Sequence, residues 1–373
     1  MKKDLFLLML CVGIGGFAQG QTPFSVLQKG KYAVGFRTYF AYDTARPAIM
    51  EQTEKSKGRA MQINVWYPAK STKTQPLNFN EYVQLSGKEI NPQNPDGQTP
   101  LADHFDWTLK EGAKNEDIKE FKTSGVTMWA RREAAAANTH APVVLLMHGK
   151  AADFAFLGEF LASHGFVAIH TPYKGYAQAE LDVKLLGMDT QVTDYEFAVS
   201  HLKTKIKADF SKTAVLGVSF GGQSAVAYTF RNPVQAVVSF DGGIGSQWGA
   251  SLLTQTKAYQ LKNIKTPLLH LFNPRDPYTH LAAIKKYSYC DRTLIGIKNM
   301  EHAHFWAWGA LDKWIPNALG ATRPGQTYEA VLQMTLDFLN KHQKGIVANS
   351  WPAWVKSCQD SVEEFKISAP KNS

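Results

Sequence analysis

In the second half of the chain, short apolar runs alternate with longer amphipathic stretches. Short, nearly continuous apolar runs predict strands over residues 143–147, 166–170, 214–218, 236–240, 268–272 and 293–297. Amphipathic stretches between them predict helices at about 153–164, 190–204, 220–231, 278–287 and 326–342. Strands that are apolar on both faces and separated by helices favour an α/β fold, with a mostly parallel central sheet covered by helices on both faces.

The N-terminal third has a different pattern. Residues 31–44 and 61–67 are rich in β-branched and aromatic residues and lie between turn residues. We expect them to form an antiparallel pair at one edge of the sheet. Residues 69–125 are polar with few apolar runs, which predicts an irregular insertion, and 126–137 predicts a helix that leads back to the core. We therefore expect one domain over residues 21–373.

The first twenty residues have the pattern of a signal peptide. Two lysines at positions 2 and 3 precede an apolar stretch over 5–17, and Ala18-Gln19-Gly20 offers small residues before a cleavage at Gln21. The apolar stretch is too short for a comfortable membrane span. The sequence therefore predicts a secreted or periplasmic protein, cleaved near Gly20-Gln21.

Composition is that of a globular protein with a substantial core, because 44% of the 373 residues are hydrophobic and 20% are charged. The formal net charge is +9 and the isoelectric point is near 9.2. The basic residues show no long run, so the charge predicts a generally basic surface and no nucleic-acid partner. Association with a membrane surface or an anionic polymer stays open.

Two cysteines, Cys290 and Cys358, remain after the signal peptide, and pairing and free thiols are both open for them.

One segment carries the pattern of a catalytic serine. Residues 213–230 read as an apolar strand, the motif Gly217-Val218-Ser219-Phe220-Gly221, and a helix of small residues. This strand–turn–helix context is what a nucleophilic serine on a sharp turn requires. The turn brings the positions two before and two after the serine together, so both favour glycine. Ser219 is the predicted nucleophile, and the N–H of Phe220 is a predicted oxyanion donor at the helix start.

A second oxyanion donor is expected from the loop after an earlier strand. The strand over 143–147 ends in His148-Gly149-Lys150, where the glycine lets the chain turn back toward the serine. We expect the N–H of Lys150 to be this donor. We interpret His148 as a residue that shapes the loop and takes no part in catalysis.

A serine at neutral pH needs a base. In this type of site the order along the chain is serine, acid, histidine, which points to His302 directly after the last strand, with His304 as the alternative. No nearby carboxylate or third histidine completes a usual zinc pattern, so we expect no metal there. Asp241 and Asp276 each follow a strand between the serine and the histidine, and the pattern alone does not separate them.

These motifs resemble a known family. The segments YAVGFRTYFAYDTAR, INVWYPA, LLMHGK, GVSFGG, SFDGG and EHAHF occur in the order seen in platelet-activating-factor acetylhydrolases and dienelactone-hydrolase-like proteins. The resemblance spans roughly residues 30–340 and implies an α/β-hydrolase fold and esterase chemistry without a metal or organic cofactor. It implies Asp241 as the acid and His302 as the base, with Phe305 three residues later. Many other dienelactone-hydrolase-like proteins use the position of Asp276.

We therefore predict a serine hydrolase, esterase- or lipase-like, that cleaves a carboxylic ester of a small or lipid-like molecule. An acetyl or other short-acyl ester is favoured. The insertion 69–125 and the aromatic run 305–308 are expected either to wall the pocket or to belong to the core, and a cationic Lys150 at the mouth would favour acidic substrates. The alternatives are an inactive binding protein on the same scaffold, a serine peptidase and a thioesterase.

Overall fold

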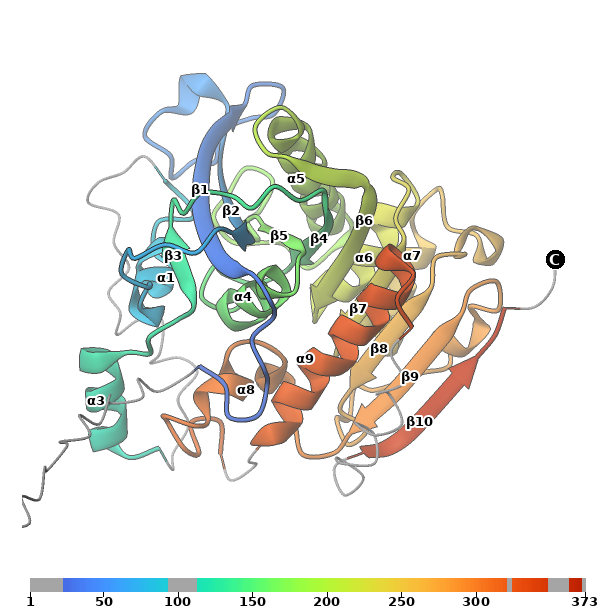
Figure 1. The fold of residues 1–373 in the computed structure, drawn as a ribbon. Helices are drawn as coiled ribbons and strands as arrows, with labels where there is room; N and C mark the ends of the chain where they lie inside the picture. Colours follow the sequence, from blue (N-terminus) through green and yellow to red (C-terminus); the bar gives the residue numbers. More distant parts are fainter. Residues whose placement is uncertain (1–22, 93–112, 321–323, 348–361, 371–373) are drawn as a thin grey trace, which may run out of the picture.

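A ten-stranded mixed sheet runs through the middle of the molecule (Figure 1). The computed structural model describes residues 23–92, 113–320, 324–347 and 362–370. The predicted signal peptide and Cys358 lie outside these ranges. The strand order is β10-β9-β8-β7-β6-β4-β5-β2-β1-β3.

Six strands form the parallel part of the sheet, as the pattern of apolar runs predicts. They are β4 (Ala141–Met147), β5 (Val167–His170), β6 (Ala208–Val218), β7 (Ala236–Phe240), β8 (Leu268–Phe272) and β9 (Arg292–Ile297). Every residue of β4 is buried, because helices cover both faces of this strand.

The outer strands are mostly antiparallel. The N-terminal pair, β1 (Ala33–Asp43) and β2 (Arg59–Ala69), joins the parallel part where β2 pairs antiparallel with β5. The short β3 (Ala130–Arg132) pairs parallel with β1. At the opposite edge β10 (Val362–Ser368) pairs antiparallel with β9. The predicted α/β fold with an antiparallel N-terminal edge is confirmed, whereas the second antiparallel edge is an addition.

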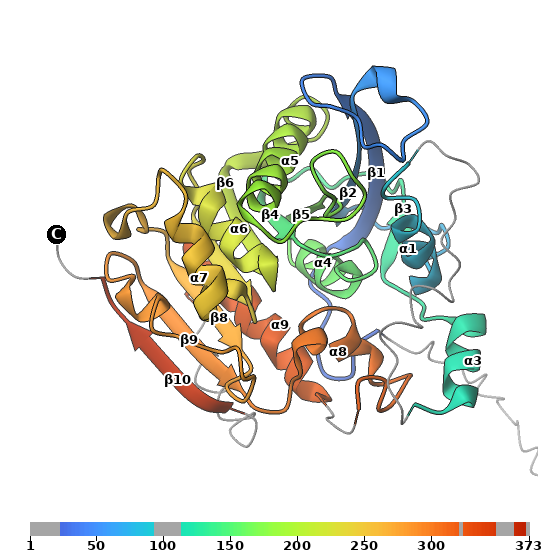
Figure 2. The same ribbon diagram turned by 180° about the vertical axis from the view of Figure 1, so that it is seen from behind.

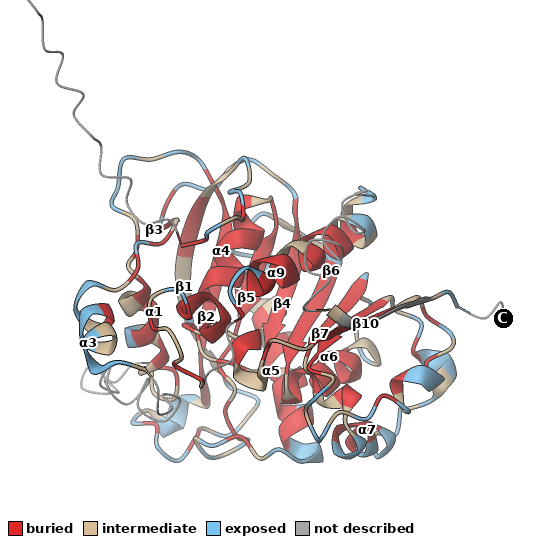
Figure 3. Cartoon of the chain, turned by 90° about the horizontal axis from the view of Figure 1, so that it is seen from below, coloured by how far each residue is buried: buried red, intermediate tan, exposed pale blue. Residues whose placement is uncertain are grey.

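Helices cover the two faces of the sheet in separate layers (Figures 1 and 2). On one face α4 (Ala155–Ser163), α8 (Trp308–Leu311) and α9 (Gln326–Leu339) pack into one apolar cluster. On the other face α5 (Leu185–Lys203), α6 (Phe220–Thr229) and α7 (Gln247–Thr254) pack into a second cluster. Burial is therefore concentrated in the central strands and in the helices beside them (Figure 3). Among the described residues, no helix combines the length and apolar character that crossing a membrane requires.

The insertion contributes two of the described helices, α1 (Phe79–Ser86) and α3 (Asn115–Ser124). An Asn78 capping box starts α1. Its Tyr82 lies against Phe36 of β1 and Trp66 of β2, with ring centroids 4.9 and 5.8 Å apart. The first helix of the insertion is thus part of the core at the N-terminal edge.

Short single-turn segments complete the described secondary structure. The 3-10 turns are Lys55–Lys57, Gly243–Gly245, Leu261–Asn263, Ile284–Lys286 and His302–Phe305, and a π-helical turn at Asn340–Lys344 follows α9.

Two predicted helices are wrong. Residues 126–137 run extended and include β3, because Val126, Met128 and Ala130 are buried alternately with more exposed neighbours, which is the two-residue period of a strand. Residues 278–287 form turns that end in a 3-10 turn. Thr279 forms an isolated β-bridge with Ser246, and the N–H of His280 donates to the carbonyl of Gly245, so these contacts keep the start of the segment out of a helix.

Candidate active site

Ser219 lies on the sharp turn between β6 and α6. Its backbone has φ 54° and ψ −124°, outside the regions that most residues adopt. A side chain at Gly217 would place its Cβ 2.0 Å from the carbonyl oxygen of Gly221, so this turn needs glycine at the first of these positions. Such strain in a non-glycine residue is typical of a functional site and persists because the surrounding structure holds it.

Two hydrogen bonds connect the serine to a histidine and an aspartate that are far away in sequence. The Oγ of Ser219 lies 2.9 Å from Nε2 of His302, and Nδ1 of the same ring lies 2.6 Å from Oδ2 of Asp241. In the neutral imidazole that fits this network, Nδ1–H donates to the carboxylate and Nε2 accepts from the serine hydroxyl. The structure thus brings the predicted nucleophile, base and acid together at the carboxyl ends of β6, β7 and β9.

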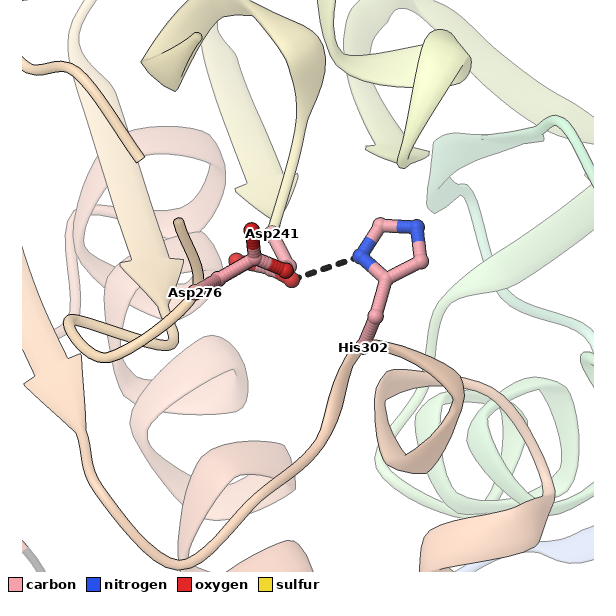
Figure 4. Close-up of side chains that lie close together, drawn as sticks. All are labelled: Asp241, Asp276 and His302. Atoms are coloured by element: carbon pink, nitrogen blue, oxygen red, sulfur yellow. Dashed lines mark hydrogen bonds and ion pairs between the residues drawn. The ribbon is translucent and has the colours of Figure 1, made fainter. Parts of the chain in front are cut away.

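The structure places the two candidate acids differently (Figure 4). Asp241 accepts the Nδ1–H of His302, and its other oxygen accepts the N–H of Asn273 at 3.0 Å. Asp276 accepts the N–H of Tyr278 at 2.7 Å within its own turn. Asp241, Asp276 and His302 each have one ligand atom within 4.8 Å of the others, a spacing that a metal ion could bridge. The hydrogen bond from His302 to Asp241 already uses the imidazole nitrogen nearest the carboxylates.

The environment of His302 favours its protonated form. Partial burial of the ring acts to lower its pKa, but the hydrogen bond to Asp241 and the negative charges of Asp241 and Asp276 raise the pKa above the ordinary value of 6.5. The second aspartate thus acts on the base through its charge. The ring is a stronger base than an isolated imidazole and still exchanges protons near neutral pH.

The alternative base lies elsewhere. His304 is buried, and its Nδ1 accepts the backbone N–H of Glu301 at 2.9 Å, so this ring closes the 3-10 turn that carries His302. Trp306, which the sequence did not single out from the aromatic run 305–308, braces the site. Its Nε1–H donates to the carbonyl of His148 at 3.0 Å, and its ring meets that of His302 edge-on at 5.3 Å.

The loop after β4 differs from the prediction. The N–H of Phe220, as the first residue of α6, has no acceptor within its own helix and remains a candidate oxyanion donor. The N–H of Lys150, predicted as the second donor, instead donates to the carboxylate of Asp153 at 2.8 Å. The prediction is wrong for this conformation, because the turn into α4 places a carboxylate three residues later that caps this N–H.

Residues of the insertion hold the next two N–H groups of the same loop. Ala151 donates to Oε1 of Glu89 at 2.7 Å, and Ala152 donates to Oγ of Ser86 at 3.0 Å. Both acceptor side chains are buried. The described part of the insertion therefore stabilises the loop through these two hydrogen bonds. None of its described residues lines the cavity over Ser219.

A cavity of about 510 Å³ opens over the serine. Its lining consists of His148, Val183, Ser219, Phe220, Asp241, Gly242, Gly243, Gly245, Ser246, Trp248, His270, Asp276, Tyr278, Thr279 and His302. Trp248 and Tyr278 are 49% and 79% exposed, so two large aromatic side chains stand at the rim. No lysine or arginine belongs to this lining, and Lys150 is outside it.

Two comparisons place the chain among known proteins. Residues 132–289 match the model of the dienelactone hydrolase family. A solved structure titled as a ferulic acid esterase from Streptomyces cinnamoneus is similar at a TM-score of 0.61 and 16% sequence identity. The match covers 87% of this chain and 94% of that chain. The resemblance to α/β-hydrolases of the dienelactone hydrolase type, expected from the motifs, is thereby confirmed.

Proposed function

We propose that this protein, an α/β-hydrolase with a dienelactone hydrolase family domain over residues 132–289, cleaves carboxylic esters through a covalent intermediate on Ser219. The observation that carries the proposal is the continuous hydrogen-bonded path from Ser219 through His302 to Asp241, with distances of 2.9 and 2.6 Å. A weak nucleophile, a base within reach and a carboxylate that orients the base are the three parts that acyl transfer to a serine requires.

In the proposed reaction His302 takes the proton of Ser219 as Oγ attacks the ester carbonyl. The carbonyl electrons move to oxygen, and the N–H of Phe220 stabilises the resulting anion. His302 then gives its proton to the leaving alcohol as the carbon–oxygen bond breaks. Water then attacks the acyl carbon and gives a proton to the same imidazole. His302 returns this proton to Oγ of Ser219 as the acyl–oxygen bond breaks, which releases the acid and restores the serine. Asp241 stays ionised throughout and stabilises the imidazolium.

The charges that line the cavity favour a substrate with an uncharged acyl group. The described residues that line it include two carboxylates and no lysine or arginine, so an anionic group on the substrate would meet like charge. The hypothesis that a cationic Lys150 selects acidic substrates is therefore not retained. An acetyl or other short-acyl ester fits the mechanism with space to spare.

An aromatic acyl group is a second candidate, favoured by Trp248 and Tyr278 at the rim of a cavity of about 510 Å³. Aromatic side chains pack well against a planar ring. The structural relative is titled a ferulic acid esterase, which is consistent with this class.

The test is hydrolysis of p-nitrophenyl esters from acetate to octanoate, together with a methyl ester of an aromatic acid. Wild-type protein, Ser219→Ala and the control Ser211→Ala are assayed in parallel. Ser211 lies exposed at the start of the strand that carries Ser219, so its loss should leave turnover unchanged. Turnover that disappears only in Ser219→Ala supports the proposal, and equal turnover in both variants contradicts it. Amide and thioester substrates in the same assay separate the peptidase and thioesterase alternatives, and folded wild-type protein without any turnover favours the binding protein.

We further propose export followed by cleavage before Gln21, on the basis of the N-terminal sequence pattern. Expression of the full chain in a bacterial host and N-terminal sequencing of the exported protein test this. A mature protein that starts at Gln21 supports export, and a retained Met1 contradicts it.

A further inference from the structure

His148 lies on the wall of the catalytic cavity, together with Ser219, Phe220 and His302. It directly follows β4 and touches the serine turn from the opposite side. A side chain at Gly221 would place its Cβ 2.8 Å from the Cβ of His148, so glycine at this position lets the two segments approach. The imidazole therefore shares the space in which an ester carbonyl would meet the serine.

Aromatic neighbours fix the ring in this place. The His148 ring lies 4.8 Å from Tyr173, 5.6 Å from Phe220 and 6.4 Å from Trp306, measured between ring centroids. The indole of Trp306 also holds the carbonyl of His148 through its N–H. Packing on several sides leaves the ring little rotational freedom, so its nitrogens keep fixed directions in the cavity.

The charge state of the ring is equally well defined. Burial first, and then the nearby His302, lower the pKa of His148 to about 3. The imidazole is therefore neutral near pH 7 and carries one N–H. Its Nδ1 is buried and has no hydrogen-bond partner among the described residues. A bare acceptor is easier to bury unpaired than an N–H donor, so the proton belongs on Nε2, the nitrogen left for the cavity.

The backbone of His148 is unusual as well. Its φ is +68°, a left-handed conformation that strains a non-glycine residue. Glycine would adopt this conformation without strain, whereas the chain here carries an imidazole on the cavity wall. Meanwhile the N–H groups of Lys150, Ala151 and Ala152 all donate to side-chain oxygens. The loop thus presents the cavity with an imidazole where backbone donors were expected.

We propose that Nε2–H of His148 is the second oxyanion donor, opposite the backbone N–H of Phe220. This role rests on the proposed esterase function. As the Ser219 Oγ–carbon bond forms and the carbonyl π electrons move to oxygen, the neutral imidazole donates a hydrogen bond to that oxygen. The proton stays on Nε2 throughout, and His302 alone moves protons between serine, leaving group and water.

Two variants test this donor. His148→Gly removes the imidazole and suits the left-handed backbone, and His148→Phe keeps a packed ring without the N–H. Each is compared with wild type for kcat and KM on the p-nitrophenyl ester that wild type hydrolyses fastest. Inhibition by benzeneboronic acid, which forms a tetrahedral anionic adduct on an active serine, is measured beside it. Thermal unfolding of each variant controls for folding.

We expect both variants to lose on the order of 10²-fold in kcat with KM little changed, as removal of one oxyanion donor does. The inhibition constant for benzeneboronic acid should rise by a similar factor. Full kcat in folded His148→Phe would assign the ring to packing alone and overturn the proposal. If His148→Phe does not fold, an unchanged boronic acid constant in His148→Gly has the same meaning. Absence of Ser219-dependent turnover in wild type would instead refute the esterase function itself.

Discussion

The cavities at the two ends of the parallel strands are lined by side chains of different charge. At the carboxyl ends of the strands, the described residues that line the cavity over Ser219 include Asp241 and Asp276 and no lysine or arginine. At the amino ends, two adjoining cavities of about 580 and 570 Å³ have no acidic residue in their linings. Their cationic side chains are Arg37, Lys70, Lys205 and Lys207 in one, and Lys31, Lys212 and Lys344 in the other.

The net charge of +9 therefore gives no guide to the charge of the described residues around Ser219. A cation close to His302 would lower the pKa of that imidazole and compete for Asp241, so its absence from the cavity lining protects the base. Seven lysine and arginine side chains line the two cavities at the amino ends of the strands, away from the proposed base.

The largest effect at the catalytic edge is expected from His302→Ala. Loss of the base should reduce kcat by about 10⁴-fold or more, since members of such a triad act as a unit. The measurement is kcat on a p-nitrophenyl ester. His304→Ala should lower the unfolding temperature but keep most of the turnover, because His304 bonds to Glu301 and does not reach the serine. The reverse result would exchange the two roles.

The next largest effect is expected at the aspartates, where Asp241 and Asp276 should differ. Asp241→Asn removes the acceptor of the Nδ1–H and should lower kcat by about 10³- to 10⁴-fold, as loss of the orienting carboxylate does in other serine triads. Asp276→Asn removes only a nearby charge and should cost about tenfold or less. Steady-state kinetics of both variants decide this, and a greater loss in Asp276→Asn would make Asp276 the acid.

The pH profile offers a finer test of the same pair. Activity requires neutral His302, so kcat/KM should fall as the pH drops through the raised pKa of this residue, above the ordinary 6.5. Removal of a negative charge lowers that pKa and extends activity to lower pH. We expect a larger acidward shift in Asp241→Asn than in Asp276→Asn. An unshifted acid limb in both variants would exclude His302 as the titrating base.

The contact between the insertion and the β4 loop should have a smaller effect. Glu89→Ala leaves the buried N–H of Ala151 without its acceptor, which should cost about 1–3 kcal/mol in the free energy of unfolding. Glu89→Gln keeps an acceptor oxygen and serves as the matched control. Denaturant unfolding measures both. Equal stability of Glu89→Ala and wild type would show that the insertion does not support this loop.

The smallest effect is expected at the basic edge. Lys205→Gln with Lys207→Gln removes two charges that line the larger cavity. Because these residues line a cavity at the opposite edge of the sheet, kcat/KM on a neutral ester should stay within about twofold of wild type. The same assay at low and high salt measures any long-range electrostatic effect. A large change in kcat/KM would show that these lysines influence the site around Ser219.

Most of the sheet could be predicted from the sequence, because strands buried on both faces are nearly continuous apolar runs. The runs at 236–240 and 268–272 coincide with β7 and β8. The second antiparallel edge, β10, was missed because it lies far from the repeating strand–helix pattern in the chain. The stretch 126–137 was misassigned because alanines and arginines favour helices locally, while alternate burial against β1 holds it extended.

The site was predictable where a motif fixes the backbone, and less so where tertiary contacts decide. Ser219 could be predicted from the glycines around it, and His302 from its place after β9, the last strand of the parallel part. The commitment of the Lys150 N–H to Asp153, the role of Trp306 and the gathering of lysines at one edge depend on segments that meet only after folding. No short-range spacing signals these contacts.

The most direct test of the central claim is covalent labelling of the serine with a fluorophosphonate, followed by intact mass measurement and peptide mapping. We predict one adduct per chain, located on Ser219, with loss of ester hydrolysis in proportion to labelling. Ser219→Ala should remain unlabelled and Asp276→Asn should label fully. An unlabelled wild-type protein, or an adduct on another residue that accompanies the loss of activity, would contradict the account.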